Sequence, residues 1–131
     1  MARDVSTHLM FEGHAEEAMN LYVSLFADSK VKQIERYAAG EMGAEGTVKR
    51  ADFTLAGRDF LCIDSPMKHA FTFTPSVSIF VECESEAELE SVFGRLSDGG
   101  AVLMPLGDYG FSKKFGWLTD RFGVSWQLNL S

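Results

Sequence analysis

Residues 5–26 read VSTHLMFEGHAEEAMNLYVSLF, and residues 76–97 read SVSIFVECESEAELESVFGRLS. In both stretches a short apolar run is followed by apolar residues at helical spacing, which predicts a strand and then an amphipathic helix. Phe11 in the first stretch corresponds to Val81 in the second, and Met19 corresponds to Leu89, so the period is about 70 residues. The pattern indicates two copies of one supersecondary unit.

Three more strand patterns follow each helix. Those of the first half lie at 30–37, 47–55 and 59–63, and those of the second half at 101–106, 111–118 and 124–130. Gly57 marks a tight turn between two of them, which predicts a β-hairpin. Ser85 with Glu88 predicts a capping box at the start of the second helix.

The order of elements is therefore βαβββ, repeated. One such unit leaves one face of its sheet bare, and two units can curl their sheets toward each other. We predict an α+β fold in which two tandem βαβββ modules form one cup-shaped sheet with the helices outside. The predicted single domain spans 1–131, with module 1 at about 1–66, a link at about 67–75 and module 2 at about 76–131.

The composition excludes several classes of function. Hydrophobic residues make up 46% of the chain, and the net charge is -7, with a pI of about 4.9. An acidic surface repels phosphate backbones and anionic lipids, so we expect neither nucleic-acid nor membrane binding. No secretory signal or apolar span is evident, and Cys62 and Cys83 are a poor disulfide framework. These features predict a cytoplasmic protein with reduced thiols.

The most specific motif is in the tail, where Phe115-Gly116-Trp117 precedes DRFGVSWQ at 120–127. With HLMF at 8–11 and EEA at 16–18, these residues resemble the vicinal oxygen chelate superfamily, which includes glyoxalase I and bleomycin-resistance proteins. The closer resemblance is to its PhnB-like branch, often labelled 3-demethylubiquinone 3-methyltransferase. It covers essentially the whole chain and implies a homodimer that holds a small molecule in the cup.

The resemblance also implies where a metal would be held. Enzymes such as glyoxalase I bind a divalent cation with His and Glu from four strands. Aligned by nearby glycines and strands, the four metal-ligand positions of the family correspond to Thr7, Cys62 (or Asp64), Ser76 and Gln127 of this sequence. Neutral hydroxyls and amides are poor ligands on their own, so we predict no metal and no cofactor. His8 is one residue from the first position and should point to the opposite face, near the first helix or partly exposed.

In the cup architecture the polar side of the last strand faces the cavity. The expected lining combines apolar and uncharged polar side chains: Thr7, Leu9, Phe11, Phe60, Cys62, Ser76, Ser78, Trp117 and Gln127. Trp117 shares its strand face with Phe111 and Phe115, which either roof the pocket or pack between subunits. Asp64 is the nearest candidate for a general base, and its alternative role is to cap the turn at Pro66.

Three functions remain open from the sequence. The first is a metal-free small-molecule-binding protein with no assigned reaction. The second is an enzyme of the lyase, isomerase or dioxygenase type, with Asp64 as base. The third is a dimeric interaction module with a filled cup. The Gly-rich run at 40–46 leads into a strand rather than a helix, so it predicts a hairpin loop and not a conventional methyl-donor site.

Overall fold

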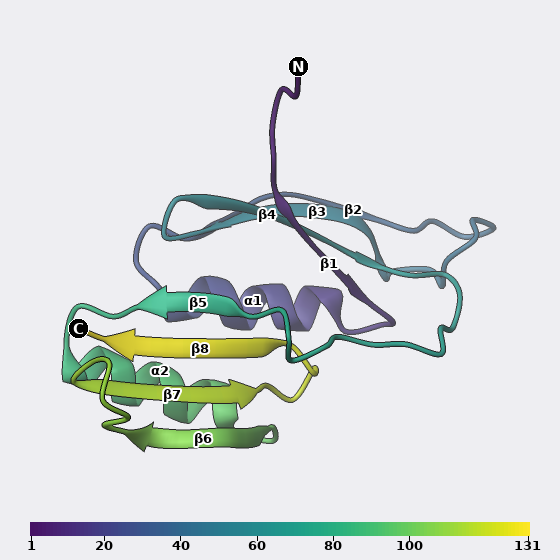
Figure 1. Ribbon diagram of the computed structural model, residues 1–131. Helices are drawn as coiled ribbons and strands as arrows, with labels where there is room; N and C mark the ends of the chain where they lie inside the picture. Colours follow the sequence, from purple (N-terminus) through teal and green to yellow (C-terminus); the bar gives the residue numbers. More distant parts are fainter. The chain divides into compact units, whose positions relative to one another are not determined.

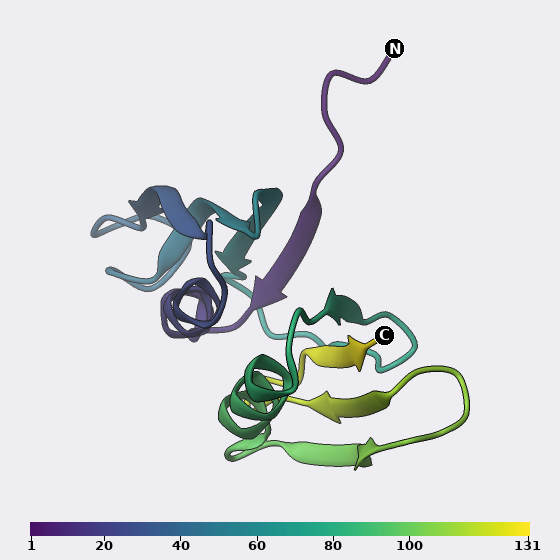
Figure 2. The same cartoon turned by 90° about the vertical axis from the view of Figure 1, so that its left-hand side faces the viewer.

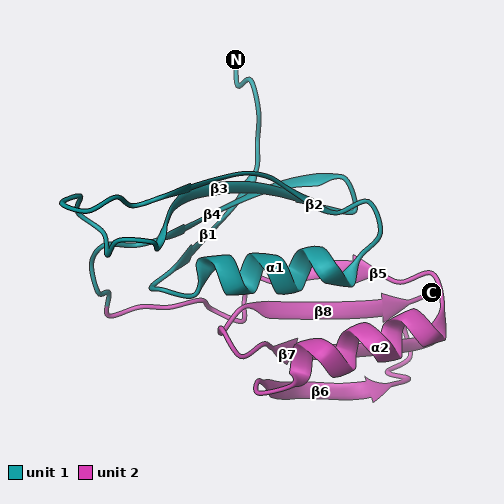
Figure 3. Cartoon of the chain, turned by 180° about the vertical axis from the view of Figure 1, so that it is seen from behind, with its two compact units in different colours: residues 1–69 teal, residues 70–131 magenta.

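The structure is a computed structural model that describes all 131 residues and divides into two compact units, residues 1–69 and 70–131 (Figure 3). Unit 1 contains β1 (Thr7–Phe11), α1 (Ala15–Leu25), β2 (Lys30–Arg36), β3 (Val48–Leu55) and β4 (Arg58–Asp64). Unit 2 contains β5 (Ile79–Glu82), α2 (Glu86–Ser97), β6 (Ala101–Gly107), β7 (Lys114–Thr119) and β8 (Ser125–Leu130). Both units have the predicted βαβββ order, which confirms the α+β fold and the duplication.

The two sheets have the same topology (Figure 1). In unit 1 the strand order is β1-β4-β3-β2, and the first strand pairs with the last in parallel. In unit 2 the order is β5-β8-β7-β6, again with a parallel pair of first and last strands. The remaining neighbours in both sheets are antiparallel. The last strand of each unit is therefore an interior strand.

The predicted hairpin is formed by β3 and β4, with Leu55 opposite Arg58. The two residues of its turn, Ala56 and Gly57, have φ of 49° and 79°. Two positive φ values in succession are typical of the tight turns that match the twist of a hairpin.

Each helix covers one face of its own sheet, as Figure 2 shows in a view roughly along the helices. In unit 1 the buried residues of α1 are Ala15, Ala18, Met19 and Tyr22. In unit 2 the buried residues of α2 are Leu89, Val92, Phe93 and Leu96, the four that helical spacing predicts. Close packing under α2 also requires Gly116, because a Cβ there would lie 2.5 Å from the Phe93 ring and 2.8 Å from Leu106.

Two strands begin later than predicted. The strand expected at 76–81 begins at Ile79, because a turn at 74–77, with the Val77 amide bonded to the Thr74 carbonyl, precedes it. The strand expected at 111–118 begins at Lys114, after a turn in which Gly110 has a φ of 98°. Ser76 is therefore an exposed turn residue. Neither helix is long and apolar enough to span a bilayer.

Candidate functional site

Each sheet has one face that carries no helix, and this face is named its helix-free face. In unit 2 the strand registers arrange its side chains in rows that run across the sheet. One row holds Phe80, Gln127, Trp117 and Met104, and the next holds Glu82, Asn129 and Phe115. These residues alternate with Trp126, Leu128 and Leu118, which are fully buried. Alternation along the strands therefore places the two rows opposite α2.

A hydrogen-bonded network of uncharged groups lies at one end of this face. The Gln127 amide nitrogen donates to Ser78 Oγ at 3.2 Å, and Ser78 Oγ and Ser125 Oγ are 2.7 Å apart. The Trp117 indole nitrogen donates to Ser125 Oγ at 2.9 Å. The network connects three of the predicted site residues, Ser78, Trp117 and Gln127.

Ser125 belongs to the network but lies outside the predicted set of site residues, although the sequence contains the signal for it. Residues 124–130 alternate strictly between apolar and polar side chains, which places Ser125 on the same face as Gln127. It is 1% exposed and accepts the indole hydrogen bond. Ser76, by contrast, lies before the strand, and its amide donates to Thr74 Oγ1 rather than to this network.

In unit 1 the structure places four predicted pocket residues on the helix-covered face. Leu9, Phe11, Phe60 and Cys62 are all buried, with Cys62 0% exposed. They share that face with Ala51 and Phe53 of β3, against which α1 packs. The side chains of these four residues therefore point toward α1 and not into the expected cavity. The reason is that the apolar side of α1 packs against the apolar alternate residues of β1 and β4. His8, which the sequence predicts to point away from the cavity, falls on the helix-free side and is exposed.

Asp64 is buried, with 3% of its surface exposed. Its Oδ1 accepts hydrogen bonds from the amides of Gly13 at 2.7 Å and Ala15 at 3.0 Å. Its Oδ2 accepts from the amide of Val48 at 2.9 Å. Both oxygens are thus engaged by backbone donors, two of them at the start of α1. This arrangement is that of a capping carboxylate and leaves no oxygen directed at a substrate.

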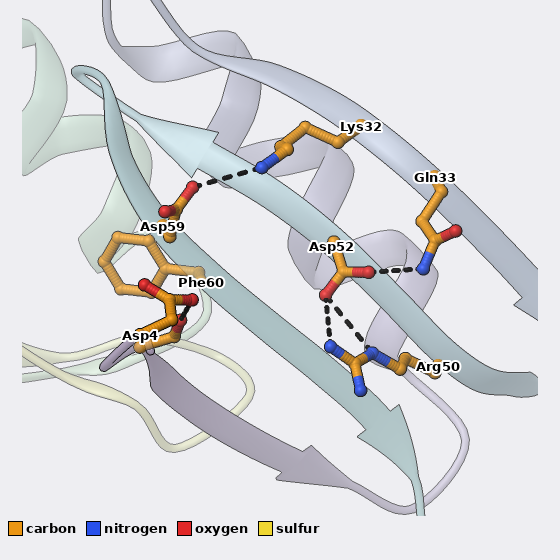
Figure 4. Close-up of a pocket in the computed structure, with 8 residues that line it drawn as sticks. Asp4, Lys32, Gln33, Arg50, Asp52, Asp59 and Phe60 are labelled. Atoms are coloured by element: carbon orange, nitrogen blue, oxygen red, sulfur yellow. Dashed lines mark hydrogen bonds and ion pairs between the residues drawn. The ribbon is translucent and has the colours of Figure 1, made fainter. Parts of the chain in front are cut away.

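A polar pocket of about 380 Å³ opens on the helix-free side of unit 1 (Figure 4). Four of its charged groups form two ion pairs: Lys32 of β2 with Asp59 of β4 at 3.3 Å, and Arg50 with Asp52 along β3 at 3.1 Å. The fifth, Asp4, accepts a hydrogen bond from Ser6 Oγ at 3.0 Å. Residue Phe60, whose ring lies on the helix-covered face, contributes to the lining of this pocket and, with Thr7, to that of a smaller pocket of about 330 Å³. No pattern in the sequence indicates the larger pocket, because the pairing of β2 with β3 includes a register shift between Val31 and Gln33.

The residues at the four inferred metal positions do not fit a divalent cation. Thr7, Ser76 and Gln127 offer only neutral oxygen or amide donors, and Cys62 is enclosed on the helix-covered face. Neither unit gathers three His, Cys, Asp or Glu side chains into a group that could hold a metal ion. A hard or borderline cation needs several carboxylates or imidazoles together.

The two thiols are buried and unpaired with each other. Burial raises the pKa of Cys62 to about 12, with a further contribution from the negative charge of Asp64. Burial likewise raises the pKa of Cys83 to about 11, and the neighbouring carboxylates of Glu88 and Glu82 add to the effect. Both thiols are therefore protonated at neutral pH, as expected for core residues.

The repeated βαβββ fold is shared with known structures. A glyoxylase/bleomycin resistance protein/dioxygenase domain from Frankia shares the fold, with a TM-score of 0.66 at 15% identity over 100% of this chain and 98% of that chain. The fosfomycin resistance protein FosX from Listeria monocytogenes also matches, with a TM-score of 0.63 at 12% identity over 100% and 94% of the two chains. The chain therefore shares its fold with both of these proteins.

Proteins of higher sequence identity show the family to which the chain belongs. The family model for 3-demethylubiquinone-9 3-methyltransferase matches residues 3–129, so the chain belongs to this family, also called PhnB-like. A PhnB protein from Bacillus cereus is 57% identical over 98% of this chain and 100% of that chain, with a TM-score of 0.96. Protein PA1353 from Pseudomonas aeruginosa is 26% identical over 99% and 98%, with a TM-score of 0.86. No curated protein matches the chain.

Proposed function

We propose that this PhnB-like protein binds a small organic molecule on the helix-free face of unit 2, without a metal ion. The observation that carries the proposal is the network of Gln127, Ser78, Ser125 and Trp117. Ligand sites in proteins combine apolar walls with a few fixed polar groups. Here the polar groups are held in place by one another, and the half-exposed ring of Phe80 lies beside Gln127 in the same row.

The chemistry of the network favours an uncharged, oxygen-bearing ligand group. Gln127 and the two serines provide amide and hydroxyl groups, which can both donate and accept hydrogen bonds. No cationic side chain takes part in the network, so a carboxylate or phosphate would find no charged partner there. Alcohols, ketones and diols are the classes that match such a set of groups.

The proposal is tested by screening small hydroxy, keto and diol compounds with ligand-observed NMR. We expect at least one compound to bind, and the Gln127→Ala variant to weaken binding about tenfold through loss of a fixed hydrogen-bonding group. Asn20→Ala, an exposed amide on α1, serves as the control and should bind as the unaltered protein does. If no compound binds, or if Gln127→Ala binds normally, the proposed site is wrong.

The metal-free part of the proposal is tested by titrating the purified protein with Zn²⁺, Ni²⁺ and Mn²⁺ in a calorimeter. We expect no tight stoichiometric site, because the donor set consists of neutral groups. One tight site per chain that is lost in His8→Ala would contradict this part, since His8 is the exposed imidazole on the helix-free side of unit 1.

We also propose that the partner of the chain is a second copy of itself. The family resemblance supports this, as do large apolar side chains exposed on unit 2, among them Phe71 at 64% and Val77 at 73% exposure. Apolar residues exposed in this way are common at interfaces between proteins. Light scattering after size exclusion should give twice the 14.5 kDa mass of the chain, and a monomer at micromolar concentration would contradict the proposal.

A further inference from the structure

One buried polar atom on the helix-free face of unit 2 has no partner. Asn129 is 7% exposed, and its side-chain oxygen accepts no hydrogen bond. The Ser112 hydroxyl is also unmatched, but it lies in the loop before β7 and outside the rows of this face. An unmatched buried acceptor typically costs about 1–3 kcal/mol, and a donor supplied by a ligand would recover that free energy.

The orientation of the Asn129 amide is fixed by its neighbour. The amide nitrogen donates to Glu82 Oε1 at 2.9 Å. A carboxylate can only accept hydrogen bonds, so a flipped amide would bring two acceptors together. The unmatched atom is therefore the oxygen, and it needs a donor.

The Glu82 carboxylate lies at the same place and is charged. Hydrogen bonds from Asn129, and then from the Ser131 hydroxyl and amide, lower the pKa of Glu82. Glu82 is exposed on the edge strand β5, so a molecule from solvent can reach it. An anionic group and an unmatched carbonyl oxygen thus stand side by side in one row of the sheet.

Aromatic rings continue this row. Phe115 is the cross-strand neighbour of Asn129, and the rings of Phe111 and Tyr109 meet Phe115 edge-on, with centroids 5.0 Å and 6.2 Å away. Phe111 is 64% exposed. Aromatic rings attract cations and offer apolar surface to the body of a ligand. Lys114, the residue before Phe115, is paired with Glu86 and Glu90 of α2 at 3.6 Å and 3.2 Å. Lys113 is exposed and precedes β7.

We propose that Glu82 and the Asn129 oxygen hold the protonated amine of an organic ligand whose apolar body lies against the exposed ring of Phe111, which packs on Phe115. An ammonium group has several donors and a positive charge, so it satisfies the unmatched oxygen and the carboxylate together. The net charge of -7 favours the approach of such a cation. This inference rests on the proposed function, because it adds a protonated amine to the ligand whose uncharged, oxygen-bearing group is bound by the network of Gln127 on the same face of unit 2.

The test compares 2-phenylethylamine with 2-phenylethanol, which has nearly the same shape but no charge. Binding of each to the full-length protein is followed at pH 7 by ¹⁵N-resolved NMR titration. We expect the amine to bind at least tenfold more tightly than the alcohol, with the largest shifts at residues 82, 115 and 129. In Glu82→Gln, which removes the charge and keeps one acceptor oxygen for the Asn129 amide, the preference should disappear. Glu84→Gln, two residues away, should retain it.

Equal binding of amine and alcohol would overturn the inference, and so would a preference that survives Glu82→Gln. Absence of saturable amine binding at millimolar concentration would do the same. The proposed function survives these outcomes if alcohols, ketones or diols still bind and depend on Gln127. It fails separately if neither these compounds nor the amine binds.

Discussion

The two helices of the molecule begin in different ways. α2 is capped locally, since Ser85 Oγ accepts from the Glu88 amide at 3.1 Å. α1 follows His14, whose side chain makes no capping hydrogen bond, and its first amides are bonded by Asp64 of β4 instead. A helix start always leaves amide donors that need acceptors. The Ser85 cap of α2 can be predicted from the sequence, because the capping residue is next to the helix. The Asp64 cap of α1 depends on the completed sheet of unit 1.

The largest expected effect comes from breaking the distant cap. Asp64→Ala should lower the free energy of unfolding by about 3 kcal/mol or more, because it leaves the amides of Gly13, Ala15 and Val48 without an acceptor. Asp64→Asn, which keeps one oxygen, should lose less. Urea unfolding followed by circular dichroism measures both. A loss below about 1 kcal/mol in Asp64→Ala would show that the cap contributes little.

Unit 2 also contains a buried carboxylate, Asp120, which serves a turn rather than a helix. Asp120 accepts from the amides of Phe122 and Val124 at 2.9 Å and 3.0 Å, and from the Trp126 indole at 2.9 Å. Asp120→Ala should cost about 2–3 kcal/mol, somewhat less than Asp64→Ala, because no helix dipole is involved. The same unfolding measurement ranks the two, and the reverse order would contradict the capping role of Asp64.

The local cap should matter less. Ser85→Ala should lower the free energy of unfolding by about 1 kcal/mol, the usual effect of removing a Ser N-cap. Ser91→Ala, an exposed substitution inside α2, is the matched control and should be neutral or slightly stabilising, since Ala favours helices. If both variants lose the same amount, the Ser85 hydroxyl does not act as a cap.

A further difference concerns the thiols of the two units and is observed only at alkaline pH. Because burial raises their pKa values above the ordinary value of 9.0, the stabilisation is complete below about pH 9. It is lost as the pH rises toward about 11 for Cys83 and about 12 for Cys62. Between about pH 8 and about pH 10.5 the free energy of unfolding should therefore fall more steeply than in the double variant Cys62→Ala, Cys83→Ala. If the free energy of unfolding depends on pH in the same way in both proteins, the pKa values of the two thiols are not raised by folding.

The regular patterns of the chain are sufficient to predict the elements and the duplication. The strict alternation at 125–130 places Gln127 on the correct face of unit 2, and the spacing of Leu89, Val92 and Leu96 identifies the buried side of α2. The first strand cannot be oriented in this way. Both sides of it are largely apolar, with Leu9 on one and Met10 on the other, so alternation alone does not say which side faces the helix.

The site residues also differ in whether a local sequence pattern predicts their position. Gln127 could be predicted because it lies on a strand with a clear polar side. Trp117 and Ser78 could be predicted because they lie on or beside strands of the same sheet, in the second repeat. The helix-capping contacts of Asp64 span 49 and 51 residues, and they depend on the register of β1 against β4. The charged pocket of unit 1 depends on a register shift in β2, which no local pattern reveals.

The interior position of the last strand in each sheet has a consequence for how the protein is made. β8 is the final strand of unit 2 to be synthesised, yet it lies between β5 and β7. The sheet of unit 2 therefore stays open at its centre until residues 125–130 have left the ribosome, whereas unit 1 can close as soon as β4 has emerged. The earlier half is then free to fold while the later half is still being translated.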